Sequence, residues 1–224
     1  MKNYLIMFLL SLFNNVFAPS FPIEYQQKVA KEQVKIESLR KYQMIEEKKI
    51  YEDSITLKSL KMINKFTKEE QTKIREICER QEIKTKWLYK IFSIESGGNP
   101  SAVNRDKYKN KKLVYKGSGA TGLIGFLPTT ANFLGTDTSE LKKMNVLQQL
   151  VYVEKYLEEI KKIYSIKSSS DLYLAIFRPA AIGKSDNYVI GHKNGKIFNQ
   201  NPGLDINKDS VITVKDIRKF ISLI

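Results

Sequence analysis

One carboxylate stands among residues that are expected to be buried. Trp87, Ile91, Ile94 and Glu95 are spaced at i, i+4, i+7 and i+8, so they share one face of a predicted helix. Burial raises the pKa of a carboxyl group and makes it a proton donor near neutral pH. The spacing therefore suggests a general acid at Glu95. The alternative is a solvated glutamate at a frayed helix end, and Glu95 alone does not separate the two.

Two ordered sequence blocks begin at this glutamate, ESGGNPSA at 95–102 and GATGLIGFLPTTA at 119–131. Together they resemble the catalytic core of lytic transglycosylases and goose-type lysozymes, which cleave the glycan strands of peptidoglycan. The sequence of the second block looks most like that of bacteriophage cell-wall-degrading enzymes. The resemblance extends from about Lys84 to the C-terminus. The matching residues are Glu95, Ser96, Asn99, Pro100, Ala102, Gly119, Ala120, Gly122, Leu123, Ile124, Pro128, Thr130 and Ala131.

The resemblance implies that a single glutamate acts on the β-1,4 bond between N-acetylmuramic acid and N-acetylglucosamine. Glu95 would protonate the glycosidic oxygen and then act as a base, either on the C6 hydroxyl to form a 1,6-anhydro product or on water. No cofactor is expected for this reaction. The substrate-binding residues that it implies are Ser96, Asn99, Gly122, Leu123, Ile124, Phe126, Phe177 and Tyr188.

The sequence departs from the family pattern at three positions. Gly125 stands where many relatives have glutamine, and Phe177 and Arg178 stand at the tyrosine and asparagine of an A-Y-N-A-G block. Phe177 cannot hydrogen-bond a carboxylate, although it can keep Glu95 desolvated. Another tyrosine could supply the lost hydroxyl, and the candidates are Tyr156, Tyr173 and Tyr188. A catalytically inactive cell-wall-binding or structural module is therefore the alternative to an enzyme.

The composition favours an anionic partner. The 224 residues carry a formal net charge of +14, and 27 Lys+Arg against 17 Asp+Glu lie from residue 67 onward. Nucleic-acid binding would rest on charge alone, since no RNP-type or zinc-finger pattern accompanies it, and no specific nucleic acid is expected. A single cysteine, Cys78, excludes an internal disulfide, and a single histidine, His192, excludes a multi-histidine metal site.

The N-terminal part is expected to form two segments. Residues 1–20 contain an apolar run with one preceding lysine and resemble a signal peptide or membrane anchor, with membrane association through residues 4–18. Residues 21–66 are rich in Lys, Glu and Gln without a clean heptad, which indicates a solvated helical stalk. We expect an exported or membrane-anchored protein of the bacterial periplasm or cell envelope, or a virion component. The sequence does not indicate an oligomeric state.

The remaining residues, 67–224, are expected to form a mainly α, lysozyme-like domain with a small β-hairpin. A capping box at Thr67–Glu70 starts a helix, Thr85 is the expected N-cap of the next, and 105–119 looks like a basic hairpin. Further helices are expected from Pro128 and over 147–164, and 172–177 is expected to be buried.

An acidic stretch near the C-terminus, DINKDSVITVKD at 205–216, has oxygen ligands at EF-hand-like spacing. Ser210 replaces the usual glycine, and the following helix completes half an EF-hand, as in dockerin repeats. The stretch predicts a structural calcium site, and the alternative is an Asx-rich turn without metal. The expected ligands are Asp205, Asn207, Asp209, Val211 through its carbonyl, and Asp216.

Overall fold

The computed structural model describes residues 22–105, 107–109, 112–115 and 117–224. The chain divides into two compact units, residues 1–54 and residues 55–224. The expected signal or anchor segment, residues 1–20, lies outside the described residues. Among the helices that the structure describes, none combines the length and the apolar character that a membrane span needs.

The stalk predicted over 21–66 is helical. Helix α2 runs from Ile23 to Ile63, as a stretch free of glycine and proline allows. In the first unit its large apolar side chains are exposed, including Ile23, Val34 and Met44. The second unit includes the end of this helix, because Met62 and the following Phe66 are buried in its core. The boundary between the units therefore lies earlier in the chain than the expected junction at 66–67.

Helices α3 (Lys68–Arg80) and α4 (Thr85–Glu95) follow. The capping box at Thr67 and Glu70 is confirmed, with the Glu70 amide donating to the Thr67 hydroxyl and the Thr67 amide donating to the Glu70 carboxylate. Thr85 is not the N-cap as predicted. Lys84 holds that position without a side-chain cap, and Thr85 is the first helical residue.

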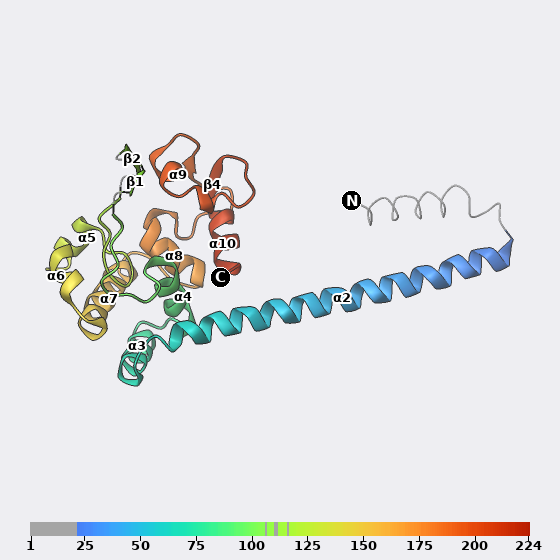
Figure 1. Ribbon diagram of the computed structural model, residues 1–224, viewed down its shortest axis with the longest axis horizontal. Coiled ribbons are helices and arrows are strands. Elements are labelled where there is room, and N and C mark those ends of the chain that lie inside the picture. Colours follow the sequence, from blue (N-terminus) through green and yellow to red (C-terminus); the bar gives the residue numbers. More distant parts are fainter. Residues whose placement is uncertain (1–21, 106, 110–111, 116) are drawn as a thin grey trace. The chain divides into compact units, whose positions relative to one another are not determined.

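The core of the second unit is helical, and α4 packs against α8 (Ser169–Phe177) within it (Figure 1). Helix α3 packs against both α4 and α7, which runs from Val146 to Lys161 and so ends earlier than the predicted 147–164. The buried positions Leu150, Val153 and Leu157 recur at helical spacing along α7. The short helices α5 (Pro128–Phe133) and α6 (Thr138–Lys143) precede it.

Two small antiparallel sheets complete the described fold. Strands β1 (Lys107–Lys109) and β2 (Lys112–Tyr115) form the predicted hairpin. Strands β3 (Val189–His192) and β4 (Val211–Thr213) form a second sheet that the sequence did not indicate. The remaining elements are η3 (Pro179–Ala181), α9 (Lys196–Gln200), η4 (Pro202–Leu204) and α10 (Val214–Ser222). The expected mainly α fold with a small sheet is confirmed.

A buried glutamine on α7 joins three segments of the second unit. The Gln149 side chain is fully buried, and its amide nitrogen donates to the Pro100 and Leu141 carbonyls, each at 2.6 Å. Its amide oxygen accepts from the Leu123 backbone N–H at 2.9 Å. A Cβ at Gly122 would lie 2.5 Å from that oxygen, so only glycine fits there. The turn at 122–125 is thus held against α7 by a side-chain hydrogen bond.

Replacing Gln149 by Met, which has a similar shape but no hydrogen-bonding groups, should strongly destabilise the second unit. The Leu123 N–H and the Pro100 carbonyl would lose their partner, while the Leu141 carbonyl would keep the Met144 N–H, at a cost of about 2 kcal/mol or more. Urea unfolding followed by circular dichroism measures this change. Gln149→Glu keeps the acceptor for Leu123 but removes both donors, and should destabilise as well. A loss below about 0.5 kcal/mol in both variants would contradict this role.

Candidate active site

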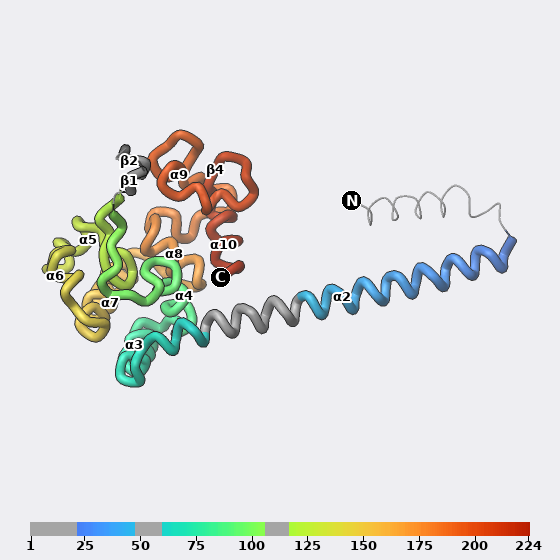
Figure 2. The backbone as a smooth tube through the Cα atoms, viewed as in Figure 1, coloured from blue at the N-terminus to red at the C-terminus, as the bar shows by residue number. Residues whose placement is uncertain are grey.

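A glycine-rich turn ends helix α4 directly after Glu95. Ser96 is the C-cap, and Gly97 and Gly98 have positive φ angles of 61° and 80°. A Cβ at Gly98 would lie 3.2 Å from the Met62 sulfur and 3.3 Å from the Phe66 ring. The turn therefore packs directly on the residues that end α2 and follow it. Figure 2 traces the backbone of the second unit, in which α4 lies beside α8.

Ser96 connects the two sequence blocks. Its hydroxyl donates to the Leu123 carbonyl at 2.9 Å and accepts from the Gly98 N–H at 3.1 Å. Backbone bonds add to this connection, since Gly122 N donates to Ala102 O at 2.9 Å. The Ser96 hydroxyl thereby holds the second block beside Glu95, and its substrate contact stays a prediction.

Glu95 opens onto a cavity of about 340 Å³. Most of its wall is backbone and small side chains, which leaves room for a ligand to approach the main chain closely. Glu95 and Gly122 were predicted for this site, Ala102, Ala120 and Gly125 belong to the two sequence blocks, and Val103, Asn104 and Arg105 were not predicted. They carry no catalytic residue type that sequence reasoning could have singled out. The lining residues are Glu95, Ala102, Val103, Asn104, Arg105, Ala120, Gly122 and Gly125.

The Glu95 carboxyl group is poised to hold a proton near neutral pH. Burial raises its pKa from 4.5 to about 7, and it makes no hydrogen bond or ion pair within the described residues that would favour the charged form. A Cβ at Gly125 would lie 3.0 Å from Glu95 Oε2, and Gly125 has a φ of +65°. Glycine at this departure from the family pattern therefore leaves space for the carboxyl group.

Tyr173 is the tyrosine whose electrostatics couple to Glu95. Its pKa is raised by burial and then by the Glu95 carboxylate. The Tyr173 hydroxyl has no hydrogen-bond partner in the part of the chain that the structure describes. Every side-chain oxygen or nitrogen that is buried from solvent in this part of the chain has a hydrogen-bond partner. The Tyr173 hydroxyl has none, so it must be in contact with solvent. It lies on α8, which packs against α4, the helix that ends at Glu95.

The other two candidate tyrosines are engaged elsewhere. The Tyr156 hydroxyl donates to the Ala175 carbonyl at 2.6 Å, and the Lys184 amine lies 5.8 Å from the centre of the half-buried Tyr188 ring. Phe177 stacks on Tyr173, with ring centroids 5.7 Å apart and planes at 17°. Phe177 thus has no hydroxyl to offer at its own position, but its ring packs on that of Tyr173, one turn earlier on α8.

Several predicted substrate-binding side chains are placed in the core. Leu123, Ile124 and Phe126 are 0%, 2% and 2% exposed, so they pack inside the unit and do not line the cavity. Asn99 is exposed, and its side-chain oxygen accepts from the Ser101 N–H at 2.9 Å in a local turn. Neither Phe177 nor Tyr188 lines the Glu95 cavity.

The acidic loop at 205–216 is organised by its own side chains. The Asp205 carboxylate accepts from the backbone N–H groups of Asp209 and Ser210 at 3.2 and 3.0 Å, and Ser210 adopts a φ of +73°. The Asn207 amide donates to Asp209 at 2.8 Å. Asp216, the expected twelfth-position ligand, instead caps α10 by accepting from the Thr213 N–H and hydroxyl.

These side chains do not converge as a full ligand set. Across the described ranges, no three or more His, Cys, Asp or Glu side chains are grouped closely enough to hold a metal ion. The loop fits part of the expected pattern, because Asp205, Asn207 and Asp209 lie in one hydrogen-bonded turn. The difference lies at Asp216, whose carboxylate stabilises the start of a helix.

A protein-family model matches the part of the chain that contains this site. Residues 72–177 match the family model described as the transglycosylase SLT domain, which belongs to the lytic transglycosylase and lysozyme-like superfamily. The match extends from within α3 to the end of α8, so it contains Glu95, both sequence blocks and Tyr173. The calcium-type loop lies outside it. No curated protein matches the chain.

Glu95→Gln should stabilise the protein in a pH-dependent way. Because the folded-state pKa is raised, the folded protein binds this proton more tightly than the unfolded chain, and wild-type stability falls as pH rises from 4.5 to about 7. The variant lacks this loss, so it should gain on the order of 2 kcal/mol over wild type at pH 8 and almost nothing at pH 4. Denaturant unfolding at both pH values measures the difference.

The matched control for this comparison is Glu158→Gln, on an exposed position of α7. It should change stability by less than about 0.5 kcal/mol at either pH. A Glu95→Gln gain that is equal at pH 4 and pH 8 would show that the carboxyl group is not destabilised by burial of its charge.

We expect the Tyr173 hydroxyl, whose pKa the Glu95 carboxylate raises, to donate to that carboxylate once it ionises, so Tyr173→Phe should raise the pKa of Glu95 further. Titration of ¹³C-labelled glutamate side chains by NMR measures this pKa directly. Tyr156→Phe is the contrasting variant. It loses the bond to Ala175, should destabilise by about 1 kcal/mol, and should leave the Glu95 pKa unchanged. An unchanged Glu95 pKa in Tyr173→Phe would remove Tyr173 from the site.

Proposed function

We propose that the unit formed by residues 55–224 is a peptidoglycan lytic transglycosylase with Glu95 as its general acid and base. The observation that carries the proposal is a buried carboxyl group, with its pKa raised to about 7, that lines a cavity together with glycines and other mostly small residues. A general acid works best when its pKa lies near the working pH. The SLT-domain match over residues 72–177 supports peptidoglycan as the substrate.

The proposed reaction needs one carboxyl group in two protonation states. Protonated Glu95 donates its proton to the glycosidic oxygen as the bond from that oxygen to C1 of N-acetylmuramic acid breaks. The resulting carboxylate accepts the proton of the C6 hydroxyl, whose oxygen bonds to C1 and closes the 1,6-anhydro ring. Glu95 is protonated again and no water is consumed. If water takes the place of the C6 hydroxyl, the same group performs hydrolysis.

The surroundings of Glu95 suit this cycle. Within the described residues no second carboxylate lines the cavity, so the two-carboxylate arrangement of most glycosidases is not assembled there. Burial favours the protonated form of Glu95 before bond cleavage, and the Tyr173 hydroxyl, whose pKa the Glu95 carboxylate raises, is proposed to support the carboxylate afterwards. Arg105 adds a positive charge to the cavity wall.

Digestion of purified peptidoglycan followed by mass spectrometry tests the proposal. The wild-type protein should release anhydro-muropeptides, and Glu95→Gln should reduce their release by about 1,000-fold or more, since the residue acts as both acid and base. Products heavier by one water would instead establish a lysozyme. Glu158→Gln serves as the control and should digest as wild type does.

Absence of fragments from the wild-type protein at every pH between about 5 and 8 would contradict an enzyme. Sedimentation of the protein with insoluble peptidoglycan would then decide for the binding-module alternative, which predicts equal binding by wild type and Glu95→Gln.

Peptidoglycan, the proposed substrate, lies in the bacterial cell envelope, so we expect the protein to act there. Export or membrane anchoring through residues 1–20 remains a prediction from their apolar run and would bring the catalytic unit to that substrate. The resemblance of the sequence GLIGFLPTTA to bacteriophage cell-wall-degrading enzymes is the reason to propose an association with a bacteriophage particle. Detection of the protein by mass spectrometry in purified virions, or its absence from them, decides this association.

We also propose that the loop at 205–216 binds calcium with a structural role. Support comes from the grouped oxygens of Asp205, Asn207 and Asp209 and from the backbone of Ser210, which adopts the positive φ that such loops need at their sixth position. Val211 would contribute its carbonyl. Binding through Asp216 would require its carboxylate to share or leave its contacts with Thr213.

Calcium removal should therefore lower the thermal stability of the wild-type protein. With calcium at about one hundred times its dissociation constant, the melting temperature should exceed that in chelator by roughly 5 °C. Asp205→Asn should abolish the difference, while magnesium at the same concentration should produce little of it. An identical melting temperature with calcium and with chelator would favour the Asx-rich turn without metal.

A further inference from the structure

Helix α10 contacts both helices that form the candidate active site, although it lies outside the matched family segment of residues 72–177. It packs against α8, which carries Tyr173, and a hydrogen bond joins it to α4, which ends at Glu95. Part of the chain beyond the family match is therefore built into the same packing as the site. The buried apolar side chains of α10 are Val214, Ile217 and Ile221.

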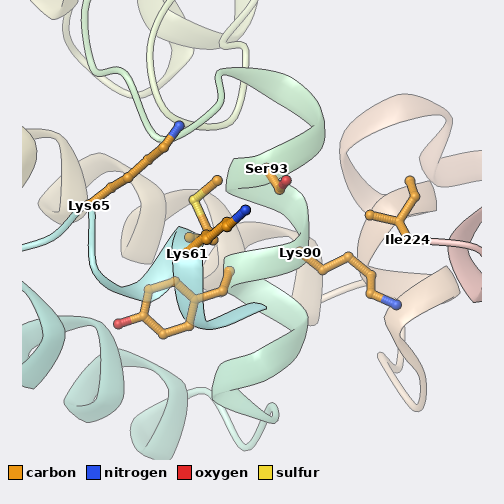
Figure 3. Close-up of a pocket in the computed structure, with 7 residues that line it drawn as sticks. Lys61, Lys65, Lys90, Ser93 and Ile224 are labelled. Carbon is orange, nitrogen blue, oxygen red and sulfur yellow. The ribbon is translucent and has the colours of Figure 1, made fainter. Parts of the chain in front are cut away.

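A lysine joins the end of α10 to α4. The Lys90 amine donates to the Ile221 carbonyl at 2.8 Å, in the last turn of α10. In Figure 3 the Lys90 side chain extends from α4 toward the segment that ends at Ile224. Lys90 and Ile224 also line the same cavity, which has a volume of about 300 Å³. The C-terminal end of α10 is thus held beside α4.

The start of α10 is held as well. Thr213 and Asp216 form a capping box there. The Val214 N–H donates to the Tyr188 carbonyl at 3.1 Å, which joins the first turn to the segment before β3. Because both ends of the helix are held, a side chain on α10 has a defined position against its neighbours.

Phe220 brings this helix into contact with the tyrosine that couples to Glu95. The half-buried Phe220 ring contacts the Tyr173 ring, with centroids 5.8 Å apart and planes at 50°. Within the described residues, the other ring contact of Tyr173 comes from Phe177 on the same helix. Phe220 is therefore the ring that restrains Tyr173 from outside α8.

The direction of the Tyr173 hydroxyl depends on this packing. Tyr173 is buried, and its hydroxyl has no hydrogen-bond partner among the residues that the structure describes. Burial and then the Glu95 carboxylate raise the pKa of Tyr173, so the two groups interact across the contact between α8 and α4. Since no bond to a partner fixes the hydroxyl, the side-chain torsions of Tyr173 determine where it points, and neighbouring rings restrict those torsions.

From these contacts we propose that Phe220 is a positioning residue of the candidate active site. Its ring keeps the Tyr173 hydroxyl directed toward Glu95, so that the hydroxyl donates to the carboxylate once Glu95 has given up its proton. This role rests on the proposed function of Glu95 as general acid and base.

Phe220 is uncharged, so its removal would change Glu95 through packing alone. Among the described residues, the titratable or charged groups placed against Glu95 are Tyr173 on α8 and Arg105 on the wall of the same cavity. Neither lies on α10, so a substitution of Phe220 leaves both groups in the chain. An effect on the Glu95 pKa would then report a change in how Tyr173 is placed.

The test is the pKa of Glu95 in the full-length wild type, Phe220→Leu, Tyr173→Phe and the double variant. It is measured by NMR titration of ¹³C-labelled glutamate side chains in the presence of chelator. Phe220→Leu should raise this pKa, lowering the proton dissociation constant by about threefold, because a freer hydroxyl stabilises the carboxylate less. In the Tyr173→Phe background the same substitution should leave the pKa unchanged.

Phe198→Leu is the matched control. Phe198 is a half-buried phenylalanine on α9 that packs against the core, and no ring contact joins it to Tyr173 in the described part of the chain. The control should lower the melting temperature and leave the Glu95 pKa unchanged. If Phe220→Leu does not fold, Phe220→Met fills a similar volume without a ring and should give the same rise in the Glu95 pKa.

An unchanged Glu95 pKa in Phe220→Leu, or an equal rise in the Tyr173→Phe background, would overturn the positioning role. A fall in the pKa would also overturn it, since Phe220 would then exclude water from Glu95 without directing the hydroxyl. The titration needs no turnover. Failure of the Phe220 role and failure of the proposed reaction are therefore distinguishable.

Discussion

The Gln149 side-chain amide is the interaction on which the candidate active site depends. One buried group pairs with the Leu123 N–H and the Leu141 carbonyl, both buried, and with the part-buried Pro100 carbonyl. Because these groups belong to both sequence blocks and to α6, their relative positions are set together. Gly122 follows from this arrangement, since any Cβ there would displace the amide.

The same framework surrounds Glu95 but gives its carboxyl group no hydrogen-bond or ion-pair partner among the described residues. Ser96 directs its hydroxyl to Leu123, and Gly125 offers no side chain, so the carboxyl group is desolvated without being neutralised. A raised carboxyl pKa costs stability once the group ionises, and such costs are common where chemistry requires them. The free energy that Gln149 and the packed helices contribute offsets this local penalty.

The sequence was sufficient for the features that local chemistry determines. The capping box at Thr67, the helix that ends at Glu95, the hairpin and the mainly α fold follow from side-chain spacing and from glycine and proline positions. Gln149 was not predicted because a glutamine on an amphipathic helix gives no sign that it faces the core. Strands β3 and β4 were missed because each has only three or four residues and pairs across a long sequence separation. Tyr173 was one of three candidates, since only packing of α8 against α4 distinguishes it.

The contact between the end of α2 and the turn after Glu95 has a mechanical consequence. Gly98 lies against Met62 and Phe66, and the Lys65 amine holds the Gly97 carbonyl, two residues beyond the proposed catalytic group. Helix α2 is continuous into this contact. A pulling load that displaced the end of α2 would therefore disturb this turn as well as the core, where Phe66 packs against Tyr89 and Phe92. A force transmitted by the proposed stalk and the geometry of the proposed acid would then be linked through one helix end.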